Sequence, residues 1–130
     1  MKILLYDGSF EGLLTAIFEI WEYRFSDAEI ISKGNYLQED IFAQTHEVFT
    51  SAEKSERVLK LLESNLGKKG VTQLLWVYFS EIPTLERLIL SAVRQSVARP
   101  GENILQNFGN ADIMEIAKTV KSVSRERHRM

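Results

Sequence analysis

Hydrophobic and polar positions follow two different periods at the start of the chain. Lys2–Tyr6 is a short aliphatic and aromatic run that stops at Asp7-Gly8-Ser9, which predicts a buried strand followed by a turn. Apolar residues then return every three to four positions, as on one face of a helix. We expect this face to point into the core, with Ser9 as the N-cap and Glu11, Thr15, Glu19 and Glu22 on the other side. The predicted inward residues are Phe10, Leu13, Leu14, Ile17, Phe18 and Trp21.

Two short strands and a helix are expected next. Ile30 and Ile31 indicate a second strand, and the β-rich segment 45–50 indicates a third. Thr50 and Glu53 have the spacing of a capping box, in which the threonine side chain binds a backbone amide of the first helical turn. The helix that follows is predicted to stop at Gly67. Its predicted buried face consists of Val58, Leu59, Leu62 and Leu66.

The second half of the chain is predicted to be helical. Residues 71–79 share a helical apolar face, although their nearly continuous apolar character also allows a buried strand over residues 74–79. Pro83-Thr84 begins another helix, and Arg99-Pro100-Gly101 ends it. A last helix starts at about Ala111. Its predicted inward residues are Ile113, Ile116, Ala117, Val120 and Val123.

The order of these elements defines the expected fold class. Strands interleaved with helices, followed by helices alone, indicate a mixed α/β (α+β) protein in which helices cover a small two- or three-stranded sheet. The spacing of the first two strands permits a parallel, right-handed crossover, while the strand order stays open. A length of 130 residues fits a single domain over residues 1–130.

Composition narrows the possible functions. Apolar residues make up 45% of the chain, which is enough for a core without disulfides or metals. The chain has no cysteine, which excludes a thiolate nucleophile and any cysteine-ligated zinc or iron–sulfur site within it. The apolar run near Met1 is far shorter than a signal sequence or a membrane span. We therefore expect a cytoplasmic protein without membrane contact.

Charge is distributed unevenly, although the net charge is only −2. Residues 1–90 contain 9 basic and 14 acidic groups, whereas residues 91–130 contain 7 basic and 4 acidic groups. On the last predicted helix, four basic residues share one sector beside the apolar stripe. These residues are Lys118, Lys121, Arg125 and Arg129. This basic strip is the predicted nucleic-acid contact, with a solvated face or a partner surface as the alternative.

The turn formed by residues 7–12 connects a strand to a helix N-terminus, where backbone amides favour a bound anion. The turn lacks the lysine of a phosphate-binding loop and the three-glycine spacing of a dinucleotide site. Asp7 and Glu11 would also repel a phosphate. We therefore interpret the turn as structural, with Gly8 serving the turn and Gly12 allowing a neighbouring element to approach closely.

No set of residues with the pattern of a catalytic or metal site is visible. His46 has no second metal ligand at a useful spacing, so a surface or half-buried histidine is expected rather than a metal site. The candidates for catalysis are Asp7, Ser9, Glu126 and His128, which do not form a recognisable nucleophile–base set. We predict no metal and no cofactor.

Two segments resemble the N-terminal part of a bacterial family named "probable DNA metabolism protein". They are Tyr6-Asp7-Gly8-Ser9-Phe10-Glu11-Gly12-Leu13-Leu14-Thr15-Ala16 and Arg125-Glu126-Arg127-His128-Arg129-Met130. The first is similar to the start of the family's domain, and the Glu-x-His-Arg-Met pattern of the second is similar to its middle. The family continues past this point with an aromatic and arginine-containing segment and a further domain-sized stretch. The resemblance thus implies that this chain is a truncated form or a shortened gene product.

The resemblance also implies a functional context. Proteins of that family are encoded beside a radical-SAM protein of DNA modification or repair, and some are fused to a uracil-DNA-glycosylase-like domain. We therefore expect an accessory protein in DNA metabolism that contacts nucleic acid or a radical-SAM partner. The resemblance transfers no catalytic residue. Two alternatives stay open: an enzyme whose site is completed by a missing C-terminal segment, and a purely structural or interaction domain.

Overall fold

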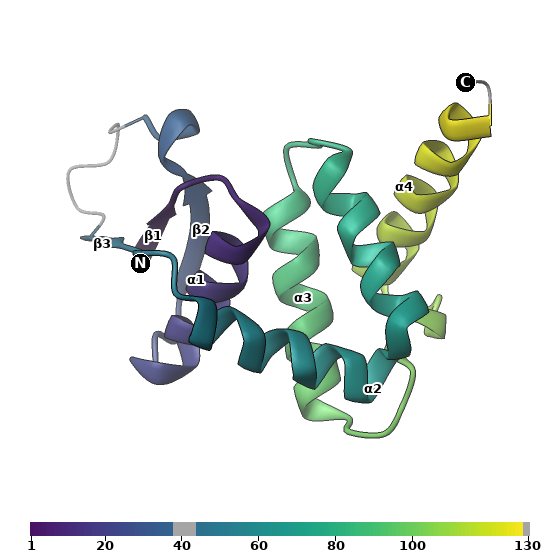
Figure 1. Ribbon diagram of the computed structural model, residues 1–130, viewed down its shortest axis with the longest axis horizontal. Helices are drawn as coiled ribbons and strands as arrows, with labels where there is room; N and C mark the ends of the chain where they lie inside the picture. The colour runs from purple at the N-terminus through teal and green to yellow at the C-terminus, as the bar shows by residue number, and fades with distance from the viewer. Residues whose placement is uncertain (38–43, 129–130) are drawn as a thin grey trace. The chain divides into compact units, whose positions relative to one another are not determined.

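The structure of the chain is a computed structural model that describes residues 1–37 and 44–128, with side chains up to Ser124. Its contacts group the chain into two compact units, Met1–Leu59 and Lys60–Met130. The single-domain expectation stays a prediction. A small sheet in the first unit and helices throughout the second confirm the mixed α/β class with a helical C-terminal half (Figure 1).

The first unit contains a three-stranded parallel sheet in the order β2-β1-β3. The strands are β1 (Lys2–Tyr6), β2 (Ala28–Ser32) and β3 (Gln44–Glu47), and a short 3-10 helix, η1 (Lys33–Asn35), follows β2. Lys2 lies opposite both Ala28 and Gln44, so β1 is the central strand. The parallel crossover between the first two strands is confirmed. The third strand ends before the predicted residue 50, because after Val48 the chain leaves the sheet towards the next helix.

Helix α1 (Phe10–Glu22) packs against β1 and β2, but its buried face is rotated from the predicted one. Leu13, Leu14 and Ile17 are buried as expected, whereas Phe10 and Phe18 are half-buried and Trp21 is 41% exposed. The placement of Trp21 in the core was therefore wrong. The buried residues of α1 also include the small or polar residues Gly12, Thr15, Ala16 and Glu19, together with the apolar Ile20.

Helix α2 (Ala52–Phe79) begins one residue later than the predicted cap implies. The side chain of Ser51, and not that of Thr50, accepts a hydrogen bond from a first-turn amide, Lys54 N, at 3.3 Å. The hydroxyl of Thr50 instead donates to Asp7 Oδ2 at 2.8 Å. The expected capping box was wrong because this tertiary hydrogen bond takes the threonine away from the helix.

The predicted stop at Gly67 appears as a break inside α2, where Gly67 has φ 74° and ψ 174°. Both angles are non-helical, and a positive φ is easily adopted only by glycine. Residues 71–79 continue as helix beyond the break, so the strand alternative for residues 74–79 was wrong. The boundary between the two units falls after Leu59, within the segment before the break. The segment after the break lies entirely in the second unit.

The second unit also contains α3 (Leu85–Ala98), a short 3-10 helix η2 (Ile104–Gln106) and α4 (Ala111–His128). The predicted boundaries of α3 and the start of α4 are confirmed. Its core is formed by apolar residues with almost no exposure: Leu74, Val77, Leu88, Ile89, Ala92, Val93 and Ile113. No helix among the described residues is long and apolar enough to cross a membrane.

Candidate functional site

The turn after β1 is a network of hydrogen bonds around Asp7. Its Oδ1 accepts from Ser9 N at 2.9 Å and from Ser9 Oγ at 2.6 Å, while its Oδ2 accepts from Thr50 Oγ1 at 2.8 Å. These hydrogen bonds, that of the Ser9 hydroxyl first, hold the pKa of Asp7 below its ordinary value. The carboxylate thereby ties the end of β1 to the loop that follows β3.

Ser9 and Gly12 complete this network at the start of α1. Ser9 Oγ accepts from Gly12 N at 2.9 Å, which confirms Ser9 as the N-cap. A Cβ at position 12 would overlap the Asp7 carboxylate and approach the hydroxyl oxygens of Ser9 and Thr50 to 3.0 Å. Gly8 has φ 90°, as a turn glycine requires. The structural roles predicted for Gly8, Ser9 and Gly12 are thus confirmed, whereas the hydrogen bonds of Asp7 were not predicted.

The four catalytic candidates are described only in part. Asp7 and Ser9 contact each other directly. Glu126 and His128 lie on the last turns of α4, and their side chains are outside the part of the chain that is described. The structure therefore brings together two of the four candidates, and it uses both of them to hold the turn.

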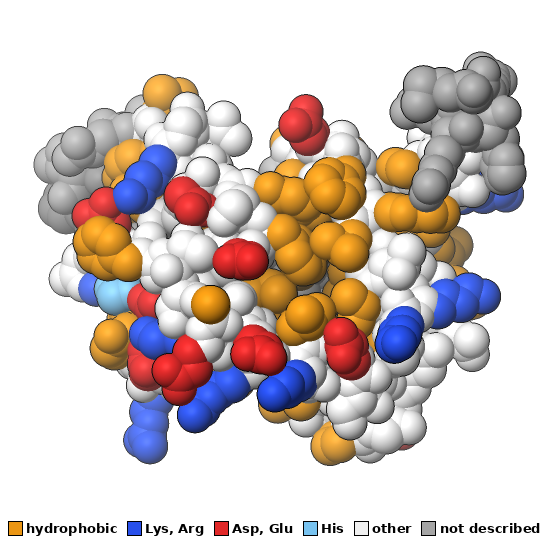
Figure 2. Space-filling model, in the orientation of Figure 1, with side chains coloured by type: hydrophobic (Ala, Val, Ile, Leu, Met, Phe, Trp, Pro, Cys, Tyr) orange, Lys and Arg blue, Asp and Glu red, His pale blue; other side chains and the backbone are white. Residues whose placement is uncertain are grey.

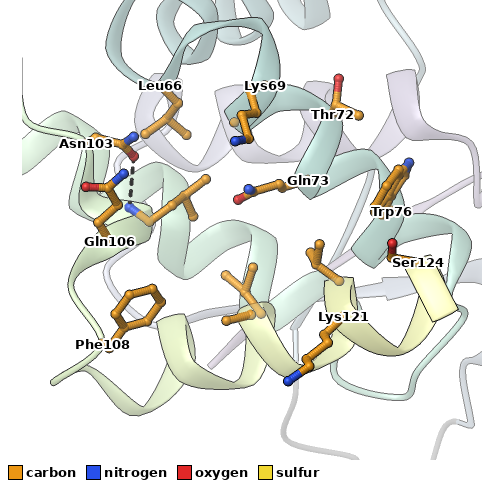
Figure 3. Close-up of a pocket in the computed structure, with 15 residues that line it drawn as sticks. Leu66, Lys69, Thr72, Gln73, Trp76, Asn103, Gln106, Phe108, Lys121 and Ser124 are labelled. Carbon is orange, nitrogen blue, oxygen red and sulfur yellow. Dashed lines mark hydrogen bonds between the residues drawn. The ribbon is translucent and has the colours of Figure 1, made fainter.

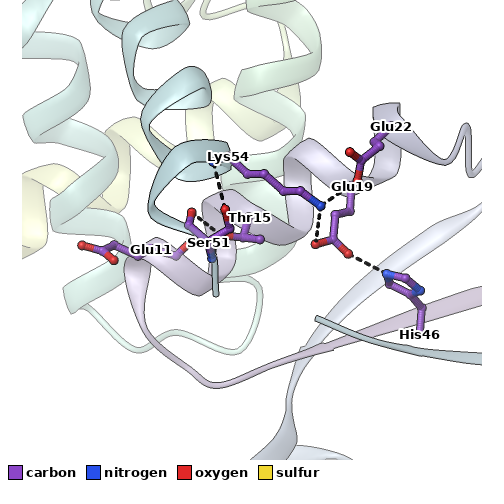
Figure 4. A network of polar contacts seen from close by, with 7 residues as sticks. All are labelled: Glu11, Thr15, Glu19, Glu22, His46, Ser51 and Lys54. Atoms are coloured by element: carbon purple, nitrogen blue, oxygen red, sulfur yellow. Dashed lines mark hydrogen bonds and ion pairs between the residues drawn. The ribbon is translucent and has the colours of Figure 1, made fainter. Parts of the chain in front are cut away.

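A second polar network, which the sequence did not predict, surrounds Glu19 (Figure 4). Glu19 is 5% exposed; its Oε1 lies 2.6 Å from His46 Nε2 and its Oε2 lies 3.3 Å from Lys54 Nζ. Lys54 Nζ also donates to Glu22 at 2.7 Å. The hydrogen bond to Glu22, and to a smaller extent Glu19, raises the pKa of Lys54 above its ordinary value. These partners replace the water that the Glu19 carboxylate loses on burial, which allows the side chain to lie in the interior.

His46 is half-buried, which is one of the two placements expected for it. The rings of Tyr23 and Phe25 lie 5.2 and 5.3 Å from its ring centroid. Within residues 1–37 and 44–124, no group of three or more histidine, aspartate or glutamate side chains has an arrangement that could hold a metal ion. The network around Glu19 therefore consists of one buried carboxylate with its cationic and histidine partners.

On α4, acidic and basic residues have different surroundings. Arg87 of α3 binds Asp112 at 2.6 Å and Glu115 at 3.5 Å, near the start of α4. Lys118 and Lys121 follow further along the helix, are exposed, and have no ion pair with any described side chain. Blue side chains lie beside α4 in the space-filling view (Figure 2). Of the predicted strip, the side chain of Arg125 and all of Arg129 fall outside the described part.

Beside this basic helix lies a cavity of about 630 Å³, within the second unit. The part of α2 after Leu66, the segment from Asn103 to Phe108, and α4 form its walls (Figure 3). Sequence reasoning missed it. The only sequence signal was the predicted inward stripe of α4, of which Ile116 is buried while Ala117 and Val120 are half-buried and line the cavity.

Comparison of the chain with family models, with curated proteins and with solved structures finds no match. The resemblance of the two sequence segments therefore stays an expectation.

Proposed function

We propose that this chain is an accessory module in DNA metabolism that contacts nucleic acid through the basic face of α4. The observation that supports the proposal best is the separation of charge along this helix. Asp112 and Glu115 are held by Arg87, whereas Lys118 and Lys121 are exposed and unpaired among the described side chains. Two such lysines, extended by Arg125 in the sequence, form a positively charged strip of the kind that binds phosphates.

The resemblance to the DNA metabolism family adds the biological context of DNA modification or repair. The same surface is also compatible with a radical-SAM protein as its partner, and the experiment below separates these two cases. The enzyme alternative has no supporting observation among the described residues, because the oxygens of Asp7 and Ser9 are engaged in the turn.

The proposal is tested by fluorescence anisotropy with labelled single-stranded DNA, single-stranded RNA and duplex DNA of equal length. If three or four phosphates are neutralised, the logarithm of the affinity falls against the logarithm of the salt concentration with a slope of about −2 to −4. The triple variant Lys118→Glu, Lys121→Glu, Arg125→Glu is expected to lose binding. A matched control reverses Lys68, Arg94 and Arg99, which lie outside α4, and is expected to keep most of the affinity.

Circular dichroism melting of both triple variants verifies that each one folds. Unchanged DNA and RNA affinity in the α4 variant, or no binding by the parent protein at low salt, would overturn the proposal and favour a protein-partner surface.

A further inference from the structure

The cavity beside α4 differs from an ordinary gap in a helical core because of the residues that line it. Its lining contains two lysines and no aspartate, glutamate or histidine. Lys69 extends from α2, and Lys121 belongs to the basic face of α4 (Figure 3). Neither lysine has an ion pair with a described side chain. In a chain with more acidic than basic residues, a cavity with only cationic charges favours an anionic ligand.

The apolar part of the lining favours a ligand with a flat, unsaturated body. Trp76 and Phe108 approach from two different walls, and Phe108 is 54% exposed. Aliphatic residues complete this surface: Leu66, Leu105, Ile116 and Val120. Aromatic side chains are the usual platforms for stacked bases at single-strand sites.

The amide side chains of the lining distinguish a heterocycle from a hydrocarbon. Gln73 and Gln106 make no side-chain hydrogen bond to any described residue, so both the donor and the acceptor of each amide are available. Asn103 is different, because its Oδ1 accepts from Leu105 N at 3.3 Å and closes the turn at η2. A fatty acyl chain would offer these two amides no hydrogen bond, whereas a nucleobase edge offers complementary donors and acceptors.

We propose that this cavity binds one nucleotide of a single strand. The base lies against Trp76 and Phe108, its edge meets Gln73 and Gln106, and the phosphate lies near Lys69 and Lys121. The volume of about 630 Å³ is within the range of roughly 300–1,000 Å³ typical of small-ligand sites. This inference rests on the proposed function and adds to it a preference for unpaired over duplex nucleic acid.

The first test uses the intrinsic fluorescence of Trp76. The chain has two tryptophans, and Trp21 lies in the other unit, so the variant Trp21→Phe leaves Trp76 as the only reporter. A deoxynucleoside monophosphate is expected to change the Trp76 emission saturably, the matching nucleoside to bind more weakly, and inorganic phosphate alone to have no effect. Phe108→Ala is expected to weaken the nucleotide about tenfold, in line with the loss of one base–aromatic contact.

The second test uses the unmodified protein, so it does not depend on the folding of any variant. A normal single strand is compared with a strand of equal length composed entirely of abasic deoxyribose phosphate units. The basic face of α4 would bind both strands with the same dependence on salt. The cavity would bind only the normal strand, so an affinity at least about tenfold higher for that strand is expected.

The outcomes separate this inference from the proposed function. Equal affinity for the two strands, with binding still lost in the α4 triple variant, would overturn the nucleotide site and leave the proposed function standing. A fatty acid that saturates the Trp76 signal where the nucleotide does not would also overturn the nucleotide site. If the parent protein binds no strand at all, both the proposed function and the single-strand site are overturned, and saturable binding of the free nucleotide would show only a mononucleotide pocket.

Discussion

The buried surroundings of Glu19 restrict its substitution. A buried carboxylate is stable only when charged or hydrogen-bonding partners replace the water it has lost, and Glu19 has Lys54 and His46 in that role. Lys54 is itself shared with Glu22. Removing the Lys54 ammonium group therefore leaves the buried Glu19 and the more exposed Glu22 without the cation that they share.

We predict that Lys54→Met lowers the free energy of unfolding by roughly 1–3 kcal/mol, because it leaves Glu19 buried without its cation. Urea denaturation measures this loss. Lys68→Met is the control, since Lys68 is exposed and has no ion pair with a described residue. In a Glu19→Gln background the cost of Lys54→Met should shrink. Equal costs in the two backgrounds would show that the pair does not interact.

Asp7 gives a prediction that depends on pH. Its folded-state pKa is lowered, first by the Ser9 hydroxyl, so the folded chain binds fewer protons than the unfolded chain in acid. The resulting stabilisation is present above the ordinary pKa of 3.8 and is lost as the pH falls through the lowered value. We expect Asp7→Asn to lower the melting temperature at pH 7, with a difference from the parent that narrows below about pH 4.

The control for this pH series is Asp27→Asn. Asp27 is exposed, and its carboxylate makes no hydrogen bond to a described residue. The same change of side chain should therefore have little effect at any pH. A constant difference between the Asp7 variant and the parent from pH 7 to pH 3 would contradict the role of the ionised carboxylate.

The two polar networks also show which side-chain roles can be predicted from sequence. Ser9 and Gly8 were placed correctly, because a cap and a turn depend on neighbours within three residues. Glu19 was placed on the solvent side, because its partners His46 and Lys54 are 27 and 35 positions away. No local pattern distinguishes a glutamate that gains distant partners from one that faces water.

Helix α1 shows that the rotation of a whole helix about its axis is also difficult to predict from sequence. Its hydrophobic stripe is wide, so more than one rotation about the helix axis buries much of it. The sequence pattern gives most weight to the largest residues, and these include Phe18 and Trp21. The packed helix instead buries Gly12, Thr15 and Glu19 as well, because their contacts with the loop after β3 and with Lys54 decide its rotation. Helix boundaries were predicted better than helix rotation.

The break in α2 leads to a prediction about Gly67. No atom lies within 4 Å of a Cβ added there, so any cost of a side chain comes from the positive φ alone. Gly67→Ala is expected to lower the free energy of unfolding by about 1–3 kcal/mol. Gly34→Ala is the matched control, because it also meets no atom within 4 Å and has no positive φ. Equal losses of melting temperature in the two variants would contradict backbone strain at position 67.

At the scale of the whole molecule, the sequence predicted the fold class but not the arrangement of its strands. Alternating strand and helix patterns were sufficient to indicate a small sheet with helices. The order β2-β1-β3 depends on whether the third strand pairs with β1 or with β2. The hydrophobic pattern of residues 45–47 does not distinguish these two positions. The cavity could not be predicted for a similar reason, since its walls come from three separate segments.

The central position of β1 also determines when its sheet can form during protein synthesis. β1 leaves the ribosome first, but its two partners, β2 and β3, start 26 and 42 residues after Lys2. Until Gln44–Glu47 has emerged, one edge of β1 has no strand to pair with, and an unpaired apolar edge readily joins another chain. The nascent first unit is therefore expected to be more prone to edge-to-edge association until its third strand is available.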